Sequence, residues 1–412
     1  MNPLLQRVLA DEPRPFALLH RPESTGADTV DLILGDVSTP DTLAEVPLRP
    51  GGGQSGHKTL VLVPYRQIAE RGYVCVDDGA PLIAMSVTDQ TLIPIADLVR
   101  ALPDVPVHLA GGHFDLDDDT YAETVRRVVA DEIGTGQGAN FVVKRSYVAD
   151  ITDYGPHRAL SFFRRLLHRE RGAYWTFLVH TGARTFVGAT PERHVSLRDG
   201  LAVMNPISGT YRYPAAGPTL PELMAFLADR KETDELYMVV DEELKMMASL
   251  CGTGGRVTGP YLKEMARLAH TEYFIEGHTT RSPLDILRET MFAPTVTGSP
   301  LENACRVISN HEPHGRGYYS GVVALISTDG HRDVMDSAIL IRTAEIDRSG
   351  RVAIRVGATL VRHSDPVSEV AETRAKAEGL LALFDGEVPH RPEAVSPPGS
   401  DTSTIARPRS TA

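Results

Sequence analysis

Two patterns of apolar and polar positions alternate along this chain. Short runs rich in β-branched and aromatic residues, typical of strands, cover residues 28–37, 58–65, 174–182, 184–190, 318–328, 336–346 and 351–362. Longer stretches repeat apolar residues every three to four positions, as amphipathic helices do, and cover residues 116–136, 220–252 (in two pieces) and 365–384. The pattern alone therefore predicts a fold of mixed α and β class, with strands and long loops over the first hundred residues.

Punctuating residues suggest where the elements and domains begin and end. Asp365 is a suitable N-cap for the last helix, and Pro366 fits its first turn. Residues 387–412 are polar and Pro-rich, which predicts a disordered tail. We expect a strand-rich N-terminal subdomain over residues 1–125 and a catalytic region over residues 126–386. The Gly-rich string "PLRPGGGQSGHK" lacks the GK[ST] ending of a P-loop, so it does not predict a phosphate site.

Composition narrows the classes of function. The formal net charge of −12 over 412 residues argues against a nucleic-acid-binding surface, and an anionic substrate would need a locally positive site. The three cysteines, Cys75, Cys251 and Cys305, are scattered and form no metal-binding spacing. With no secretory signal and no apolar run of membrane-spanning length, we expect a cytoplasmic protein without a membrane partner.

Two carboxylate pairs stand out on predicted helices. "KETDELYMVVDEELKMM" places Glu232 and Glu235 three residues apart, and "SEVAETRAKAEGLL" does the same with Glu369 and Glu372, followed by Lys376. Residues spaced by three and seven share one helix face. A single glutamate of this kind more often faces solvent, but several carboxylates together suit Mg²⁺, often bridged to an anionic ligand.

Other strings supply polar groups between these helices. Glu192 in "GATPERHVS" follows a strand and a Thr-Pro turn, a natural place for a side chain aimed into a site. "NPISGTYR" and "APTVTGSP" could bind a carboxylate through backbone N–H groups. Tyr319 in "RGYYSGVV" and Arg342 in "AILIRT" offer a hydroxyl and a guanidinium suited to carboxylate recognition.

In this order and spacing, the strings resemble the chorismate-utilising enzymes, which include anthranilate, aminodeoxychorismate, isochorismate and salicylate synthases. The resemblance covers residues 138–385 and implies an α+β fold, a β-sandwich of large, mostly antiparallel sheets wrapped by helices. It implies direct Mg²⁺ ligands at Glu235 and Glu372 and a second pair, acting through water, at Glu232 and Glu369. The further roles that it implies are general acid for Glu192, catalytic His for His270 in "AHTEYFIEG", carboxylate binding for Tyr319, Arg342 and Lys376, and positions near the ring for Thr210 and Gly298.

Departures from the family pattern indicate the nucleophile. Isochorismate and salicylate synthases activate water with a Lys, whose position here falls on Phe141 or Val142, and neither can be a general base. Lys144 lies two or three residues later and is a weaker alternative. The covalent Lys of the 4-amino-forming synthases is replaced by Ser208 in "PISGT". Ammonia adding at C2 while the C4 hydroxyl leaves is therefore the expected chemistry.

Within the family, the chain looks closest to the enzymes of phenazine and enediyne pathways that stop at 2-amino-2-desoxyisochorismate (ADIC). "GSPL", with Leu301, stands where the broader family has "GAPK", and "PFALLHRPES" also resembles the phenazine enzyme. The tryptophan-sensing "LLES" string is not matched. None of the cysteine strings fits the nucleophile turn of a glutaminase, so we expect ammonia from solution or from a separate glutamine amidotransferase subunit.

Three readings therefore remain. The first is an Mg²⁺-dependent ADIC synthase of secondary (antibiotic) metabolism, which could be a homodimer. The second is an anthranilate synthase component I, which also eliminates pyruvate; the retained His270 leaves this reading open. The third, from another class, is a catalytically silent ligand-binding or scaffold subunit. Every ionic role has a plausible occupant in this chain, which favours an enzyme.

Overall fold

The computed structural model describes residues 2–48, 55–214, 217–228, 230–252, 254–265 and 268–384. Positions 212 and 230–238 are described by their backbone alone. The predicted tail at 387–412 lies outside the described residues. None of the described helices is long and apolar enough to cross a bilayer.

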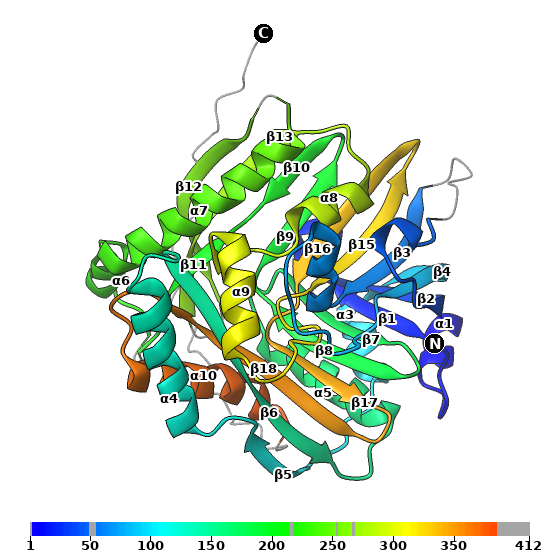
Figure 1. The fold of residues 1–412 in the computed structure, drawn as a ribbon. Helices are drawn as coiled ribbons and strands as arrows, with labels where there is room; N and C mark the ends of the chain where they lie inside the picture. The colour runs from blue at the N-terminus through cyan, green and yellow to red at the C-terminus, as the bar shows by residue number, and fades with distance from the viewer. Residues whose placement is uncertain are drawn as a thin grey trace, which may run out of the picture.

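Strands and helical segments alternate up to the strand Trp175–His180, and runs of consecutive strands make up much of the chain after it (Figure 1). The strands are β1 (Phe16–His20), β2 (Thr29–Ser38), β3 (Gly56–Val63), β4 (Ile83–Pro94), β5 (Leu109–Phe114), β6 (Asn140–Ile151), β7 (Trp175–His180), β8 (Arg184–Thr190), β9 (Arg193–Arg198), β10 (Leu201–Met204), β11 (Ile207–Arg212), β12 (Arg256–Glu264), β13 (Leu268–His278), β14 (Gly298–Ser299), β15 (Val322–Asp329), β16 (Arg332–Ile339), β17 (Thr343–Asp347) and β18 (Arg351–Leu360). The helices are α1 (Pro3–Val8), α2 (Pro22–Thr25), α3 (Ile95–Ala101), α4 (Asp118–Arg127), α5 (Pro156–Arg169), α6 (Leu220–Leu227), α7 (Arg230–Leu250), α8 (Pro283–Thr290), α9 (Leu301–His311) and α10 (Pro366–Leu381). Three shorter helical segments are η1 (Leu43–Glu45), η2 (Tyr65–Arg71) and the π-helical η3 (Val128–Ile133).

The helix predictions are confirmed in their main features. The Asp365 side chain caps α10 by accepting a hydrogen bond from the backbone N–H of Ser368 at 2.9 Å, with Pro366 in the first turn. The stretch 220–252 forms two helices, α6 and α7, as predicted. The stretch 116–136 forms α4, which continues into the π-helical turn η3.

Two strand predictions are wrong in extent. Residues 336–346 form two strands instead of one, because the backbone at Arg342 has a φ of 50°, a left-handed conformation that an extended strand cannot continue through. The predicted strand 318–328 begins only at Val322, and Tyr319 lies in the turn before it. As a result, the predicted site residues Arg342 and Tyr319 both lie outside the regular strands.

The ladders between described strands are all antiparallel and link them into one continuous, curled sheet. Its path runs β5–β6–β18–β17–β8–β7–β1–β2–β4–β3–β15–β16–β9–β10–β13–β12, with β14 added beside β6 and β11 beside β13. Strands of residues 1–125 are thus hydrogen-bonded to strands of the later region, through β1–β7, β3–β15 and β5–β6. The domain boundaries stay a prediction.

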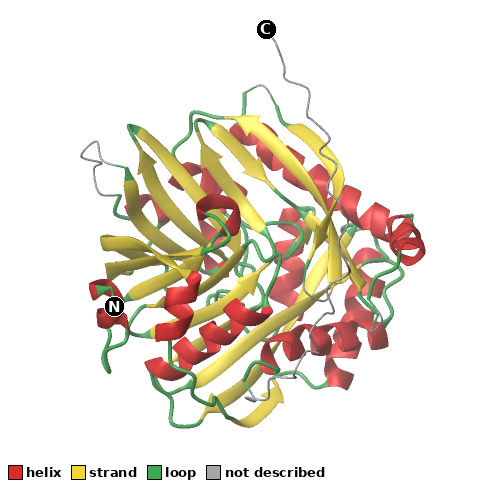
Figure 2. Cartoon of the chain, turned by 180° about the vertical axis from the view of Figure 1, so that it is seen from behind, coloured by secondary structure: helices red, strands yellow, loops and turns green. Residues whose placement is uncertain are grey.

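Period-two alternation explains how this sheet builds a sandwich. Leu60 and Leu62 of β3 face an inner core, whereas Val61 and Val63 face an outer one. The inner core also takes Trp175 from β7, and it lies between the two layers of strands. The outer faces are covered by helices, as Figure 2 shows from behind. The fold is therefore α+β, as expected.

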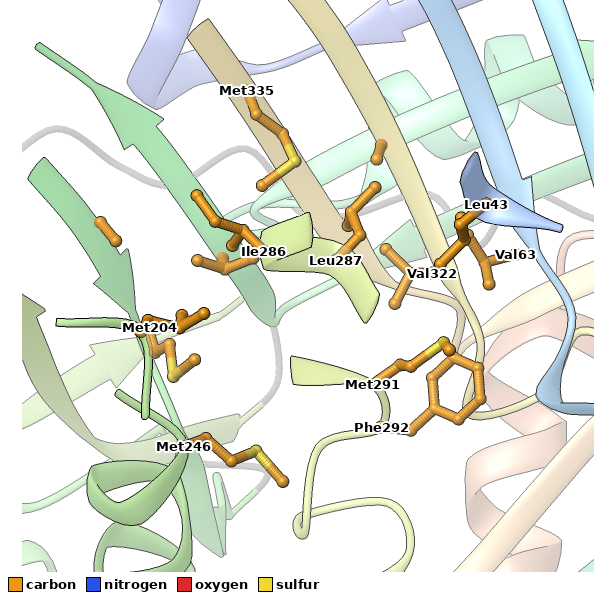
Figure 3. Packing of buried hydrophobic residues seen from close by; sticks show 14 of the residues in the cluster. Leu43, Val63, Met204, Met246, Ile286, Leu287, Met291, Phe292, Val322 and Met335 are labelled. Carbon is orange, nitrogen blue, oxygen red and sulfur yellow. The ribbon is translucent and has the colours of Figure 1, made fainter. Parts of the chain in front are cut away.

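One outer core packs α7 and α8 onto the strands beside the site. In Figure 3, Ile286 and Leu287 of α8 lie among Met204, Met335 and Val322 from three strands. These side chains are all buried, and burying such a side chain contributes about 1.5–3 kcal/mol. The packing holds α7 against β13 and β11, at one end of the sheet path.

Candidate active site

One cavity of about 740 Å³ lies where the two ends of the sheet path approach each other. Strands β6 and β18 from one end, and β11 and β13 from the other, contribute to its wall, together with α10 and, among the described side chains of α7, Val239. A cavity of this size is typical of small-molecule sites. Of the predicted site residues, it brings together Glu192, Thr210, His270, Tyr319, Arg342, Glu369, Glu372 and Lys376.

Glu192 sits in the short turn between β8 and β9, directly after Pro191, and only 1% of it is exposed. Burial raises its pKa to about 8, although the Thr295 hydroxyl, the Ile207 backbone N–H and two more distant cations act in the opposite direction. Its Oε1 atom has no hydrogen-bond partner among the described residues. At neutral pH the carboxyl is therefore mostly protonated and able to donate a proton into the cavity.

Groups suited to an anion lie across the same cavity. Arg342 occupies the break between β16 and β17, where its carbonyl accepts a hydrogen bond from the Ala189 N–H at 3.2 Å. The Lys376 ammonium donates to the Gly357 carbonyl at 2.7 Å and pairs with Glu372 at 2.6 Å. Tyr319 is 7% exposed, and burial raises the pKa of its phenol, so the hydroxyl keeps its proton. These groups can bind carboxylates through charge and hydrogen bonds.

His270 on β13 is held as a neutral imidazole. Its Nδ1 lies 2.6 Å from the Gly209 carbonyl, an acceptor, so the proton is assigned to Nδ1. Thr210 Oγ1 lies 3.4 Å from the same nitrogen. Burial and the nearby charge of Arg342 lower the pKa to about 3. The buried Nε2 has no partner among the described residues and is a weak base.

The predicted metal ligands are only half described. Glu369 is 5% exposed, the Glu372 side chain is 37% exposed, and both residues line the cavity from α10. The backbone of α7 carries positions 232 and 235, but the side chains of Glu232 and Glu235 lie outside the described ones. The described side chains alone form no group of three metal-ligand residues. Two carboxylates one turn apart beside a cavity are nevertheless donors that fit Mg²⁺.

The remaining predicted positions separate into those that reach the cavity and those that do not. Gly298 is in β14, paired with Phe141, and is not part of the lining. Of the two positions considered for the water-activating Lys, Val142 lines the cavity while Phe141 packs in a core. Ser208 also lines it. The Lys144 ammonium is buried away from the lining, near the Asp115 carboxylate at 3.8 Å.

Sequence reasoning missed several polar residues of this region. Asn140, Thr295 and Arg355 line the cavity; Thr295 lies in "APTVTGSP", which was singled out only for its backbone N–H groups. Glu243 on α7 is buried, at 4% exposure. Its spacing did carry a signal, because it follows Glu232 by eleven residues and so shares that helix face.

Comparison with known proteins agrees with this geometry. The model of the chorismate binding enzyme family matches residues 103–382. A Pseudomonas chlororaphis protein named "Anthranilate synthase, phenazine specific" is 62% identical over 390 residues, 94% of this chain and 61% of its own length. A Pseudomonas fluorescens protein of the same name is 60% identical over the same shares. The chain therefore spans about three-fifths of the length of these two relatives.

Solved structures show the same fold. The menaquinone-specific isochorismate synthase of Escherichia coli matches with a TM-score of 0.73 at 17% identity, covering 93% of this chain and 91% of that one. Anthranilate synthase component I of Streptococcus pneumoniae matches with a TM-score of 0.68 at 21% identity, covering 89% of each. The two structures show the fold alone, and the family match, which covers more than half of the chain, shows that the chain belongs to the chorismate-binding enzymes.

Proposed function

We propose that this chain aminates chorismate at C2 with loss of the C4 hydroxyl, giving ADIC for secondary metabolism. The observation that carries the proposal is a buried, protonated Glu192 carboxyl on the same cavity as Arg342, Lys376 and Tyr319. The high identity to proteins named as phenazine-specific anthranilate synthases supports this choice within the family.

Substrate binding follows from charge. Chorismate carries two carboxylates, and a chain of net charge −12 must collect positive groups locally to hold them. Arg342, Arg355 and Lys376 line the cavity and can do so. The Tyr319 hydroxyl, which keeps its proton, adds a hydrogen bond to a carboxylate.

Loss of the C4 hydroxyl needs a proton, because hydroxide is a poor leaving group. In the proposed step, the nitrogen lone pair forms the C2–N bond, the ring double bonds shift, and the C4–O bond breaks onto oxygen. Glu192 transfers its proton to that oxygen, so that water departs. A pKa of about 8 suits this role near neutral pH.

Two residues of the cavity wall favour ammonia as the nucleophile over the alternatives in this family, which are water and an enzyme lysine. Val142 and Ser208 stand on the cavity wall where a general-base Lys and a covalent Lys would be needed. The three cysteines are unsuited to glutamine hydrolysis, because burial raises the pKa of each thiol. Ammonia is therefore supplied free or by a separate glutamine amidotransferase.

We further propose that Mg²⁺ is held by Glu372 and Glu235 directly and by Glu369 and Glu232 through water. When bound, the ion would neutralise a substrate carboxylate beside α10 and orient it. The Lys376 ammonium pairs with the Glu372 carboxylate and holds this side chain along the face of α10.

His270 bears on whether pyruvate is then lost. Elimination requires a base to take the C2 proton while the C3–O bond breaks and the enolpyruvyl group leaves as pyruvate. An imidazole with a pKa of about 3 is a poor base, which favours retention of the enolpyruvyl ether. We therefore place ADIC ahead of anthranilate as the product.

The test is incubation of the chain with chorismate, MgCl₂ and an ammonium salt, followed by mass analysis of the product and a pyruvate assay. We expect an aminated ring that still bears its enolpyruvyl ether, and no turnover with glutamine alone. Stoichiometric pyruvate release would make the chain an anthranilate synthase component instead. Glutamine-dependent turnover by the chain alone would refute the need for a separate ammonia source. Chorismate binding without any turnover would point to a silent subunit.

A further inference from the structure

Four buried oxygen atoms without hydrogen-bond partners among the described residues lie around the α7 side of the cavity. They are Glu192 Oε1, Thr295 Oγ1, Asn140 Oδ1 and Glu243 Oε2. The first three belong to residues that line the cavity. Glu243 is one helical turn beyond Val239, which lines the cavity from α7, and so lies on the same helix face.

Contacts between their elements place these residues in one region. Asn140 pairs with Ser299 in the β6–β14 ladder, and the Ser299 hydroxyl donates to Glu242, the neighbour of Glu243, at 3.4 Å. Glu243 also lies within electrostatic range of Glu192, which in turn is near the Thr295 hydroxyl. The Glu192, Thr295 and Asn140 side chains thus belong to the cavity wall, and the Glu243 carboxyl lies behind that wall on α7, within electrostatic range of Glu192.

A carboxyl buried in this way is costly unless it has a partner. No arginine, lysine or histidine side chain within the described part of the chain forms an ion pair with Glu243. Burial, and then the charge of Glu192, raise its pKa well above the ordinary value for a glutamate. A cation beside Glu243 would favour the carboxylate form of that side chain, whereas Glu192, with a pKa of about 8, keeps the proton that the leaving oxygen needs.

We propose that this oxygen cluster is the ammonium subsite, and that Glu243 binds the incoming ion and takes its proton. The inference rests on the proposed function, because it assigns a place to the nucleophile of that reaction. Ammonium offers four N–H donors, which the four acceptor atoms can satisfy. It is also small, as the site requires, since Glu243 lies behind the cavity wall instead of forming it.

The proton transfers balance over one turnover. Ammonium passes one proton to the Glu243 carboxylate and becomes ammonia, whose lone pair forms the C2–N bond. The C4–O bond breaks onto oxygen, which takes the Glu192 proton and leaves as water. The new C2 ammonium group returns a proton to Glu192. Glu243 keeps its proton until the next ammonium ion enters and displaces it to solvent.

The test compares steady-state kinetics of the full chain and of Glu243→Gln with ammonium chloride and chorismate varied separately. Gln keeps the shape but cannot hold a negative charge, so we expect the KM for ammonium to rise about tenfold or more, with the KM for chorismate within about twofold. The matched control is Asp241→Asn, which removes an exposed carboxylate two residues earlier on α7. It should change neither constant.

The outcomes distinguish failure of the proposed ammonium subsite from failure of the proposed amination. A Glu243→Gln variant whose KM for ammonium is unchanged would overturn the subsite, even though the wild-type chain aminates chorismate. A wild-type chain that binds chorismate but incorporates no nitrogen would refute the proposed function and the subsite together. If Glu243→Gln does not fold, Glu243→Asp withdraws the carboxylate by one methylene and should raise the same constant selectively; an unchanged value would equally overturn the subsite.

Discussion

Replacing Glu192 by Gln should make the protein more stable while it removes most of the activity. The native site keeps this carboxyl neutral up to a pKa of about 8, whereas an ordinary glutamate titrates at 4.5. Between these two values, the unfolded chain has released the proton and the folded chain has not. Stability associated with Glu192 is therefore fully present below about pH 4.5 and is lost as the pH rises to about 8.

The size of the effect follows from the two pKa values. One unit of pKa difference corresponds to about 1.4 kcal/mol. At about pH 7, the free energy of unfolding of the wild-type protein is therefore about 3 kcal/mol lower than that of a protein whose side chain at this position never ionises. Gln is such a side chain, and it is nearly isosteric. The gain in unfolding free energy should be about 1 kcal/mol at about pH 5 and about 4 kcal/mol at about pH 8.

Urea unfolding of both proteins at these two pH values measures the gain, with a surface variant, Glu123→Gln on α4, as control. The control removes an exposed carboxylate and should shift the unfolding free energy by no more than about 0.5 kcal/mol at either pH. Turnover of Glu192→Gln should fall by about 10²- to 10⁴-fold, the usual contribution of a general acid. A stability gain that is the same at both pH values would refute the assignment of a buried, neutral carboxyl.

Three further results are expected. Turnover per free ammonia should fall as the pH rises through about 8, where Glu192 ionises, and a pH–rate profile that stays level well beyond this value would contradict its role as the acid. Glu372→Gln should raise the Mg²⁺ concentration needed for half-maximal activity by about tenfold or more, measured by metal titration, whereas normal activity at micromolar Mg²⁺ would exclude Glu372 as a ligand. Gly357→Ala would place a methyl group about 2.4 Å from the Tyr319 hydroxyl, so the KM for chorismate should rise in initial-rate assays; an unchanged KM would mean that Tyr319 does not bind the substrate.

The sequence predicted best those features that depend on residues close together in the chain. The capped start of α10 and the separation of α6 from α7 depend on residues within one or two turns, and both are as expected. The helices that were not anticipated include α1 and α3, where strands and long loops were expected, and α5, α8 and α9, although α5 has a strong amphipathic pattern and a proline at its first turn. Their apolar faces are needed only because the curled sheet leaves outer cores to be covered.

The site was predicted from a resemblance in motif order, and the structure adds what no local pattern could contain. Arg342 reaches the cavity because its left-handed backbone interrupts a strand that the apolar pattern predicted to continue. Asn140 becomes a site residue only through its pairing with Ser299, far away in the sequence. The roles of Glu232 and Glu235 stay predictions, since their side chains lie outside the described ones.

Burial without a partner links these observations into one physical account of the site. Stable interiors pair their polar groups, yet Glu192, Glu243 and His270 each have a buried polar atom left unpaired among the described residues. Each unpaired group lowers stability, as the Glu192→Gln comparison is designed to measure. The same burial keeps Glu192 protonated and His270 weakly basic, which are the properties that an amination without elimination requires. The lower stability and the chemistry of the site then have one cause, a set of groups arranged for a substrate and a small cation instead of for one another.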